Sequence, residues 1–437
     1  MYLRKDYDVV VVGGGPAGMM AAARAAECGA AVLLLEKNRQ LGKKMLITGG
    51  GRCNLTNAAD IPEMVDNIPG NGRFVYSSLH RFSGQQVRAF FGKLGIKTKV
   101  EDHGRIFPVN NRSGDVVGAL ERYLRQLGVR VRLETGAKGL VVENHRCQGV
   151  AAGEEVFTAG GVIVATGGLS YAHTGSTGEG HRLAEEAGHR ITALFPAAVA
   201  ITCSDGWIKG RAVQGLSLEN VNLTLYNGKG KRLAAESGDV IFTHWGLSGP
   251  GALRVGRVVA LEKQRDPAAV LQGKLDLFSE RTARNLEEDL QQCISAAAKK
   301  SVKNLISSLL PERLVKVLLD LAEVAPETPA GEVIKARWNT LISLMKGLPL
   351  QVTGTRPLEE ATVTGGGVSI KEINPRTMES TKIKKLYFAG EILDVDAHTG
   401  GFNMQVAFST GYVAGEAAAT ALRETLDEVD SVGVNYD

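Results

Sequence analysis

The hydrophobic pattern near the N-terminus predicts one strand–helix–strand unit. Residues 6–12 form a short β-rich run, residues 16–28 are alanine-rich and stop at Gly29, and residues 30–36 form a second apolar strand. A further helix is predicted at 114–127, and further strands at 129–133, 139–144, 148–152, 155–158 and 161–165. This order of elements is typical of an α/β nucleotide-binding domain.

A different pattern begins near Phe195, where polar and apolar residues alternate as they do in β-strands. Residues 221–226 show this alternation, and Asn227 and Gly228 supply turn chemistry. Between residues 280 and 346 glycine almost vanishes and helical periodicity takes over, at 285–297, 302–309, 312–322 and 333–345. We therefore predict a barrel or sandwich followed by a small helical cap.

The C-terminal part returns to the composition of the N-terminal part. Glycine reappears at Gly354, residues 386–390 form a strand that enters a loop, and residues 405–422 form a helix rich in Ala and Gly. A nucleotide-binding domain in two sequence segments follows from this return. The expected domains are the nucleotide-binding domain at residues 1–193 and 351–437, the barrel-like insert at 194–278 and the helical insert at 279–350.

Composition narrows the class of protein. The chain has 437 residues, more than a single core usually holds, and its 44% apolar and 22% charged residues are typical of a globular protein. The net charge of +4 is spread along the chain, so it does not indicate nucleic-acid binding. No apolar run approaches the roughly 18 residues that span a bilayer, and the N-terminus shows no cleavable signal pattern. We expect a cytoplasmic protein without a membrane partner.

The cysteines form no close pair. They are Cys28, Cys53, Cys147, Cys203 and Cys293. This spacing disfavours a disulfide scaffold, a structural zinc site and a paired-thiol redox centre, so no metal is expected and a reducing compartment fits best.

The turn after the first predicted strand carries a dinucleotide-binding fingerprint. Gly13, Gly15 and Gly18 satisfy GxGxxG between a strand and a helix, and Glu36 ends the next strand. Such glycines permit a tight turn and let a pyrophosphate approach the N–H groups at the helix N-terminus, where the macrodipole favours an anion. Glu36 can accept hydrogen bonds from ribose hydroxyls and would repel a 2′-phosphate.

A second tightly held dinucleotide would require a second strand–GxGxxG–helix unit, and the sequence contains none. Gly365, Gly366 and Gly367 are followed by Val-Ser-Ile-Lys, which is strand-like, so a tight hairpin is favoured there. The sequence thus predicts one resident dinucleotide.

Residues 42–57 (GKKMLITGGGRCNLTN) are predicted to form an unusual loop at the carboxyl edge of the sheet, where ligands bind. The N–H groups of residues 49–51, together with Arg52, could bind a pyrophosphate or the edge of a flavin, and Asn54 could hydrogen-bond the ring. Cys53 has no resolving cysteine nearby, so an inert packed thiol is favoured over a reactive one.

A second glycine-rich turn lies near the C-terminus. Glu391 and Asp394 follow the predicted strand, and residues 399–403 (TGGFN) precede the last helix. An acid after a strand can bind ribityl hydroxyls, and helix N–H groups can stabilise negative charge on N1 and the C2 carbonyl of a reduced flavin. The two glycine-rich turns together favour FAD.

Six segments carry a family resemblance. They are GGGPAG at 13–18, GKKMLITGGGRCNLTN at 42–57, ATGGLSYAHTGSTGEG at 165–180, FTHWGLSGPGAL at 242–253, VTGGGVSIKEINPRTMES at 363–380 and LYFAGEILDVDAHTGGFNMQ at 386–405. Together they resemble the BaiN-like flavoproteins, also called aminoacetone-oxidase-family enzymes or putative NAD(FAD)-utilising dehydrogenases. The resemblance covers essentially the whole chain. It implies an α/β fold with a glutathione-reductase-like FAD-binding Rossmann domain, an inserted β-barrel and a small helical domain.

The resemblance also implies which residues contact FAD. The first glycines take the pyrophosphate, Glu36 the adenosine ribose and Ala137 the adenine, while the C-terminal turn meets the ribityl chain and the isoalloxazine. The expected set is Gly13, Gly15, Pro16, Ala17, Gly18, Glu36, Lys37, Lys44, Gly50, Gly51, Arg52, Cys53, Asn54, Ala137, Thr166, Gly167, Gly168, Gly390, Glu391, Asp394, Gly400, Gly401, Phe402, Asn403 and Met404.

Few side chains stand out as catalytic, because FAD would perform the redox step. His244, in FTHWGLSGP, is a candidate proton donor, and a structural histidine is the alternative. Tyr171, His173 and His398 are similar candidates, since they lie beside glycine loops expected near the cofactor. Their alternative is a polar loop residue that packs against the insert.

The preferred hypothesis is an FAD-dependent oxidoreductase with a small organic substrate at the junction of the FAD domain and the insert. Similar families include amine oxidases and flavin-dependent reductases of steroid-like enones, so an aminoacetone-type oxidase and an enone reductase fed transiently by NADH or NADPH both stay open. An RNA- or partner-binding flavoprotein is a further alternative, although a solvated helical face explains its basic residues more simply. Those residues are Lys299, Lys300, Lys303, Arg313 and Lys316.

Overall fold

The computed structural model describes the backbone of residues 7–432 and the side chains up to residue 421. The chain divides into two compact units, Met1–Phe195 with Thr362–Asp437, and Pro196–Ala361. Each unit has its own buried hydrophobic core. Strand β16 (Leu348–Thr355) crosses the boundary expected at residue 351, because its backbone pairs with barrel strands of the second unit.

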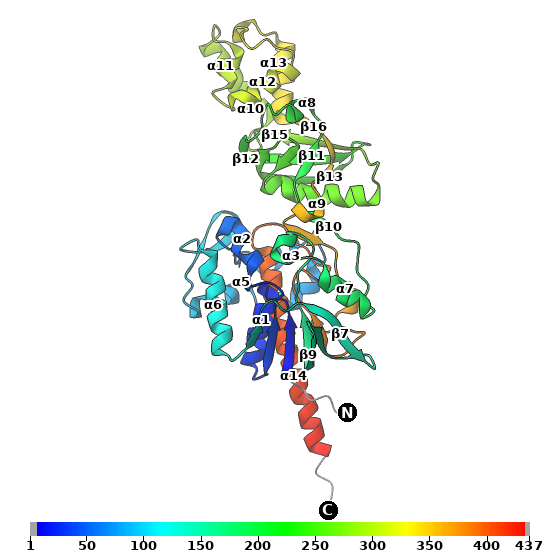
Figure 1. The fold of residues 1–437 in the computed structure, drawn as a ribbon. Helices are drawn as coiled ribbons and strands as arrows, with labels where there is room; N and C mark the ends of the chain where they lie inside the picture. The colour runs from blue at the N-terminus through cyan, green and yellow to red at the C-terminus, as the bar shows by residue number, and fades with distance from the viewer. Residues whose placement is uncertain (1–6, 433–437) are drawn as a thin grey trace, which may run out of the picture. The chain divides into compact units, whose positions relative to one another are not determined.

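The first unit is built on a sheet that has seven strands in the described part of the chain (Figure 1). The strand order is β6-β2-β1-β9-β8-β7, with β18 paired to β9. The strands are β1 (Tyr7–Val12), β2 (Val32–Leu35), β6 (Arg130–Arg132), β7 (Ala137–Glu143), β8 (Arg146–Ala152), β9 (Glu155–Val164) and β18 (Leu386–Phe388). β1 pairs in parallel with both β2 and β9. Its valines are buried, as expected for a parallel strand covered on both faces.

The helices of the first unit come from both of its sequence segments. They are α1 (Pro16–Glu27), α2 (Lys43–Gly51), α3 (Ile61–Asp66), α4 (Tyr76–Arg81), α5 (Gly84–Lys93), α6 (Ser113–Gln126), α7 (Glu179–Glu186) and α14 (Phe402–Val432). A smaller sheet of this unit contains β3 (Thr56–Asn57), β5 (Arg105–Pro108) and β4 (Thr98–Val100). Strands β10 (Phe195–Ala198) and β17 (Val363–Gly365) lie where the chain passes from one unit to the other.

Glycines on α14 let this helix pack closely against α1. A Cβ on Gly411 would lie 2.3 Å from the carbonyl oxygen of Ala17, and a Cβ on Gly415 would lie 2.2 Å from that of Ala21. Residue numbers rise together along both helices, so α1 and α14 run parallel and their N-termini point the same way. The first and last described helices of the chain are therefore one packed pair.

The second unit contains a closed barrel with strand order β11-β14-β13-β12-β15-β16. The strands are β11 (Ile201–Cys203), β12 (Ser217–Asn227), β13 (Arg232–Phe242), β14 (Gly246–Ser248), β15 (Leu271–Asp276) and β16. Val221, Leu223 and Leu225 on β12 are buried at every second position, which is the alternation that the sequence predicts. The helices of this unit are α8 (Gly206–Lys209), α9 (Pro250–Arg265), α10 (Ala283–Ala296), α11 (Val302–Ile306), α12 (Glu312–Leu321) and α13 (Lys335–Lys346).

Three local predictions were wrong. The strands expected at 155–158 and 161–165 are one continuous strand, β9, because Gly160 and Gly161 stay extended within the sheet. The loop expected at 42–57 begins as helix α2, within which Thr48, Gly49 and Gly50 leave helical geometry, and it ends in strand β3. No hairpin forms at residues 365–367, because Val368 bridges to Ile191 and Leu393.

Within the residues described, no helix combines the length and the apolar character needed to cross a membrane.

Candidate functional site

Three glycines shape the turn between β1 and α1, and their roles differ. Gly13 has a φ of +103°, and a Cβ there would lie 2.5 Å from the carbonyl oxygen of Ala165. A Cβ on Gly18 would lie 1.8 Å from the carbonyl oxygen of Gly13. A Cβ on Gly15 would meet nothing within 4 Å, and no side chain caps α1 at this residue. The N–H groups at the start of α1 therefore face a space that an anionic pyrophosphate fits.

Glu36 is a fixed carboxylate beside this turn. It is 8% exposed, and its Oε2 accepts a hydrogen bond from Gly14 N–H at 2.7 Å. Its Oε1 accepts from the backbone N–H of Asn38 at 2.8 Å and from Asn38 Nδ2 at 2.7 Å. These donors hold the Glu36 carboxylate in one orientation, and its Oε2 can still accept a hydrogen bond from a ribose hydroxyl.

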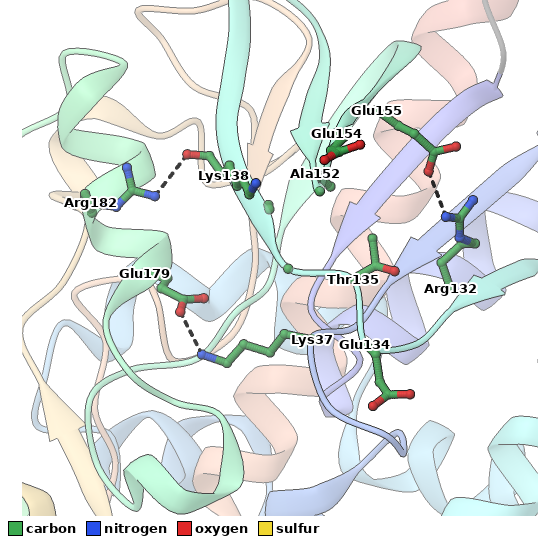
Figure 2. A pocket seen from close by; sticks show the side chains of 13 residues that line it. Lys37, Arg132, Glu134, Thr135, Lys138, Ala152, Glu154, Glu155, Glu179 and Arg182 are labelled. Atoms are coloured by element: carbon green, nitrogen blue, oxygen red, sulfur yellow. Dashed lines mark hydrogen bonds and ion pairs between the residues drawn. The ribbon is translucent and has the colours of Figure 1, made fainter.

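A cavity of about 1120 Å³ adjoins this end of the site (Figure 2). Lys37 and Ala137 line it, so two expected FAD contacts share one cavity. Lys37 Nζ donates to Thr177 Oγ1 at 2.6 Å and pairs with Glu179 at 3.1 Å. Figure 2 shows these charges at the cavity wall, together with Arg182, which donates to a backbone carbonyl. The cavity is large enough for the adenosine end of a dinucleotide.

The C-terminal glycine segment reaches the start of α1. Gly390 has a φ of +79°, its N–H donates to Thr410 Oγ1 at 2.9 Å, and a Cβ there would lie 2.7 Å from Ala17 Cβ. Gly411 packs on Ala17, which lies near the start of α1, whereas α14 already begins at Phe402. At a rise of 1.5 Å per residue, the first residue of α14 therefore lies roughly 12 Å before the first residue of α1 along the shared helix direction. Two parallel helix N-termini, offset along one direction, suit the two ends of an extended dinucleotide.

Lys44 and Glu391 lie together, as two expected FAD contacts. Lys44 Nζ is 2.7 Å from Glu391 Oε2 and donates to Ser170 Oγ at 3.0 Å. Glu391 Oε1 accepts from Ser170 Oγ at 3.2 Å and from Thr364 N–H at 2.9 Å. A Cβ on Gly168 would lie 2.4 Å from Thr364 Oγ1. The expected crossover turn, residues 166–168, therefore packs directly on this network.

Residues 49–54 differ in what they offer to a ligand. A Cβ on Gly50 would meet nothing within 4 Å, so this backbone is open. Arg52 is already bound, because its Nη1 donates to both oxygens of Glu101 at 3.1 and 2.9 Å and its guanidinium lies 4.0 Å from the centre of the Phe107 ring. Cys53 is fully buried, and burial raises the pKa of its thiol to about 12, as an inert packed thiol requires.

Asn54 and Asn403 bond to protein groups. With its amide oriented to satisfy both ends, Asn54 donates to the carbonyls of Ile106 and Thr56 at 3.1 and 3.0 Å and accepts from Gly401 N–H at 2.9 Å. Asn403 accepts from Ala397 N–H at 3.0 Å and donates to the same residue's carbonyl at 2.8 Å. Both N–H groups of the Asn54 amide are thus engaged by backbone carbonyls, and a bond from Asn54 to the flavin ring stays a prediction.

The candidate catalytic residues lie in different places. Tyr171 and His173 stand at one turn of the first unit, with ring centres 5.6 Å apart, and Tyr171 has a φ of +53°. His398 lies in the loop before α14, where its N–H donates to the carbonyl of Asn67 at 2.9 Å. His244 is exposed in the second unit, between β13 and β14, with its ring 6.2 Å from that of Trp245. Their catalytic roles stay predictions.

Sequence reasoning missed several residues that fix the site. Asn38 anchors Glu36, and Ser170 and Thr364 anchor Glu391. Ser170 and Thr364 lie in ATGGLS and VTGGG, which the sequence singled out for their glycines. The available signal was a polar residue within two positions of the glycines in each motif.

Residues 7–417 match the family described as HI0933-like protein Rossmann domain. The chain belongs to this family. It is 31% identical over 406 residues to the 3-dehydro-bile acid delta(4,6)-reductase of Clostridium scindens, with 89% of this chain and 93% of the relative covered. It is 29% identical over 406 residues to the ribosomal RNA dihydrouridine synthase of Haemophilus influenzae, with 92% and 96% covered.

A crystal structure of a 3-ketosteroid-delta4-(5alpha)-dehydrogenase from Rhodococcus jostii has the same fold. Its TM-score is 0.52 at 18% identity, covering 96% of this chain and 98% of that chain. The predicted BaiN-like family and the predicted α/β fold with a Rossmann-type sheet and an inserted barrel are confirmed. The chain is an FAD-dependent oxidoreductase of this family.

Proposed function

We propose that this oxidoreductase reduces a carbon–carbon double bond conjugated to a carbonyl group in a small organic molecule. The observation that carries the proposal is the offset pair of parallel helix starts, α1 beside Gly390 and α14 beyond it, which suits one FAD. The relative from Clostridium scindens, named as a delta(4,6)-reductase of a 3-dehydro bile acid, supports the choice of substrate class.

FAD, when bound, supplies the hydride chemistry of such a reaction. In this proposal the N–H groups at the start of α1 hold the pyrophosphate, and Glu36 accepts from the ribose. The N–H groups at the start of α14 face the isoalloxazine, where the positive end of the helix dipole favours negative charge. Lys44 is neutralised by Glu391, so the pair adds hydrogen-bonding groups without a net charge.

The electron donor in this proposal is NADH or NADPH, which visits the flavin and leaves. One strand–GxGxxG–helix turn is present in the part of the chain that the structure describes, at residues 13–18. A single such turn leaves no dedicated second Rossmann site. A transient donor is consistent with this arrangement.

Anaerobic mixing tests both parts of the proposal. We expect NADH or NADPH to bleach the visible band of the bound flavin, and a steroid 4-en-3-one to restore it without oxygen. If neither nicotinamide bleaches the flavin and aminoacetone does, the amine-oxidase alternative replaces the proposal.

Ribosomal RNA is the competing oxidant in the same experiment. The basic residues that suggested RNA binding are largely engaged within the second unit: Lys303 and Lys316 lie 3.2 and 3.4 Å from Glu312, and Arg313 donates to the carbonyl of Gln214. We therefore expect unmodified ribosomal RNA to leave reduced flavin unchanged. Reoxidation by RNA, and not by the enone, would overturn the proposed substrate class.

A further inference from the structure

Three buried side chains from residues 54–57 bind the segment that begins α14. Asn54 accepts from Gly401 N–H at 2.9 Å. Asn57 Nδ2 donates to the carbonyl of Gly400 at 2.9 Å, and Thr56 Oγ1 donates to Gln405 Oε1 at 2.5 Å. All three residues are buried: Asn54 is 8% exposed, Asn57 3% and Thr56 0%. We call this set, Asn54, Thr56 and Asn57, the polar clamp.

The clamp residues are themselves held from a second side. Asn57 Nδ2 also donates to the carbonyl of His103 at 2.9 Å, and its Oδ1 accepts from Ala59 N–H at 2.9 Å. Asn54 donates to the carbonyl of Ile106 at 3.1 Å. Every hydrogen-bonding group of the Asn57 amide is in use, so its side chain has one permitted orientation.

The clamp lies so close to the backbone at positions 400 and 401 that these positions require glycine. Gly400 and Gly401 have φ values of +136° and +98°, which favour glycine. A Cβ on Gly401 would lie 2.2 Å from the carbonyl oxygen of Thr56 and 2.9 Å from the side-chain amide of Asn54. The carbonyl of Gly401 accepts the hydrogen bond from Gln405 N–H at 2.9 Å, so the clamped residue is where the helix begins.

We infer that the polar clamp is a positioning device for the first turn of α14, and that it thereby sets the reduction potential of the flavin. This inference rests on the proposed placement of the isoalloxazine at that turn. In this inference the clamp acts through its bonds to residues 400, 401 and 405, which fix the direction of the N–H groups at the start of α14. Those dipoles stabilise the anionic reduced flavin only when they are aimed at it, so loosening the clamp lowers the potential.

The experiment compares Thr56→Val with Thr56→Ser and Thr224→Val in the FAD-loaded full chain. Thr56→Val keeps the shape of the side chain and removes the bond to Gln405, whereas Thr56→Ser keeps the hydroxyl. Thr224→Val makes the same chemical change in the barrel, where Thr224 Oγ1 donates to Asn222 Oδ1 at 3.1 Å. Midpoint potentials are measured by equilibration with a redox dye, and FAD dissociation constants by flavin fluorescence.

We expect Thr56→Val to lower the ratio of reduced to oxidised flavin about ten-fold at a fixed potential, which is about 30 mV for a two-electron couple. Thr56→Ser and Thr224→Val should keep the wild-type potential. Asn57→Ala should shift the potential in the same direction as Thr56→Val and further. A wild-type potential in both Thr56→Val and Asn57→Ala, with FAD bound, would overturn the inference. If the wild-type chain binds no FAD, the proposed function fails first.

Discussion

Gly15 faces a different constraint from Gly13 and Gly18. A side chain at Gly13 or Gly18 would collide with backbone, whereas a Cβ on Gly15 meets only open space in the described structure. Stability and cofactor binding are therefore separable at this turn. The fold requires two of the glycines, and in our proposal the ligand requires the third.

Gly15→Ala should leave the melting temperature nearly unchanged and weaken FAD binding at least ten-fold, because the methyl group would occupy the space of the pyrophosphate. Flavin fluorescence gives the dissociation constant. Gly92→Ala on α5, where a Cβ also meets nothing within 4 Å, is the matched control and should keep wild-type affinity. Equal affinity in the Gly15 and Gly92 variants would contradict the assignment of the pyrophosphate.

His189 is a second residue whose surroundings determine a measurable property. It is 3% exposed, with Nδ1 at 3.1 Å from Glu372 Oε2 and Nε2 at 3.0 Å from Ser380 Oγ. Ser380 Oγ accepts from the N–H groups of Lys382 and Ile383, so its own proton is directed to the imidazole. Burial lowers the pKa of His189 below its ordinary 6.5, and the Lys382 ammonium acts in the same direction.

The free energy of unfolding should therefore fall as the pH drops below 6.5. The unfolded histidine takes up a proton at its ordinary pKa while the folded one resists it, which gives a slope of up to about 1.4 kcal/mol per pH unit. Burial raises the pKa of Glu372, but the Lys382 ammonium and the Arg190 N–H hold it below the ordinary 4.5. Protonation of Glu372 therefore changes the free energy of unfolding only at a lower pH. Urea unfolding between pH 7 and 5 measures the slope. An unchanged slope in His189→Gln would contradict this origin.

Among the helices, the contact between α1 and α14 determines the geometry of the site. Helix propensity alone favours Gly411→Ala by up to about 1 kcal/mol. The contact opposes it, because the new methyl group would lie 2.3 Å from the Ala17 carbonyl, and overpacking of this kind costs about 1–3 kcal/mol. The contact term is the larger one.

Gly411→Ala should therefore destabilise the chain and weaken FAD binding, since it separates the two helix starts that, in our proposal, bind one ligand. Chemical denaturation and FAD titration measure the two effects. Gly92→Ala on the exposed face of α5 should be neutral or stabilising. A stabilised Gly411→Ala variant would show that the helices can move apart without cost.

The local spacing of glycine, apolar and polar residues predicted the elements that neighbouring residues determine. The strand–GxGxxG–helix turn, the barrel alternation and the glycine-poor helices follow from spacing, and they are present in β1 and α1, in β12, and in α10–α13. Segments determined by distant contacts were predicted less well. Thr56 binds Gln405 across 349 residues, and no spacing rule indicates that contact. The same reason explains the wrong hairpin at residues 365–367, where the glycines make room for backbone at Ala193 and Ile392.

For the whole molecule, two separate cores imply two separable stabilities. The proposed FAD contacts belong to the first unit, whereas Phe242 is buried in the core of the second. FAD at about one hundred times its dissociation constant should stabilise the first unit by about 2.7 kcal/mol. It should leave the second unit unchanged.

Differential scanning calorimetry with and without FAD tests this separation. Phe242→Ala should destabilise the second unit by about 3–5 kcal/mol and keep FAD affinity within a factor of two. A loss of FAD affinity in Phe242→Ala comparable to that in Gly15→Ala would contradict the assignment of FAD to the first unit.

The most direct measurement is a crystal structure of the full chain after saturation with FAD. The account predicts one FAD per chain, with its pyrophosphate at the N–H groups after Gly15, its adenosine beside Glu36 and Ala137, and its isoalloxazine at residues 400–404. A folded chain that takes up no FAD, or an FAD bound with its ring at Glu36, would contradict it.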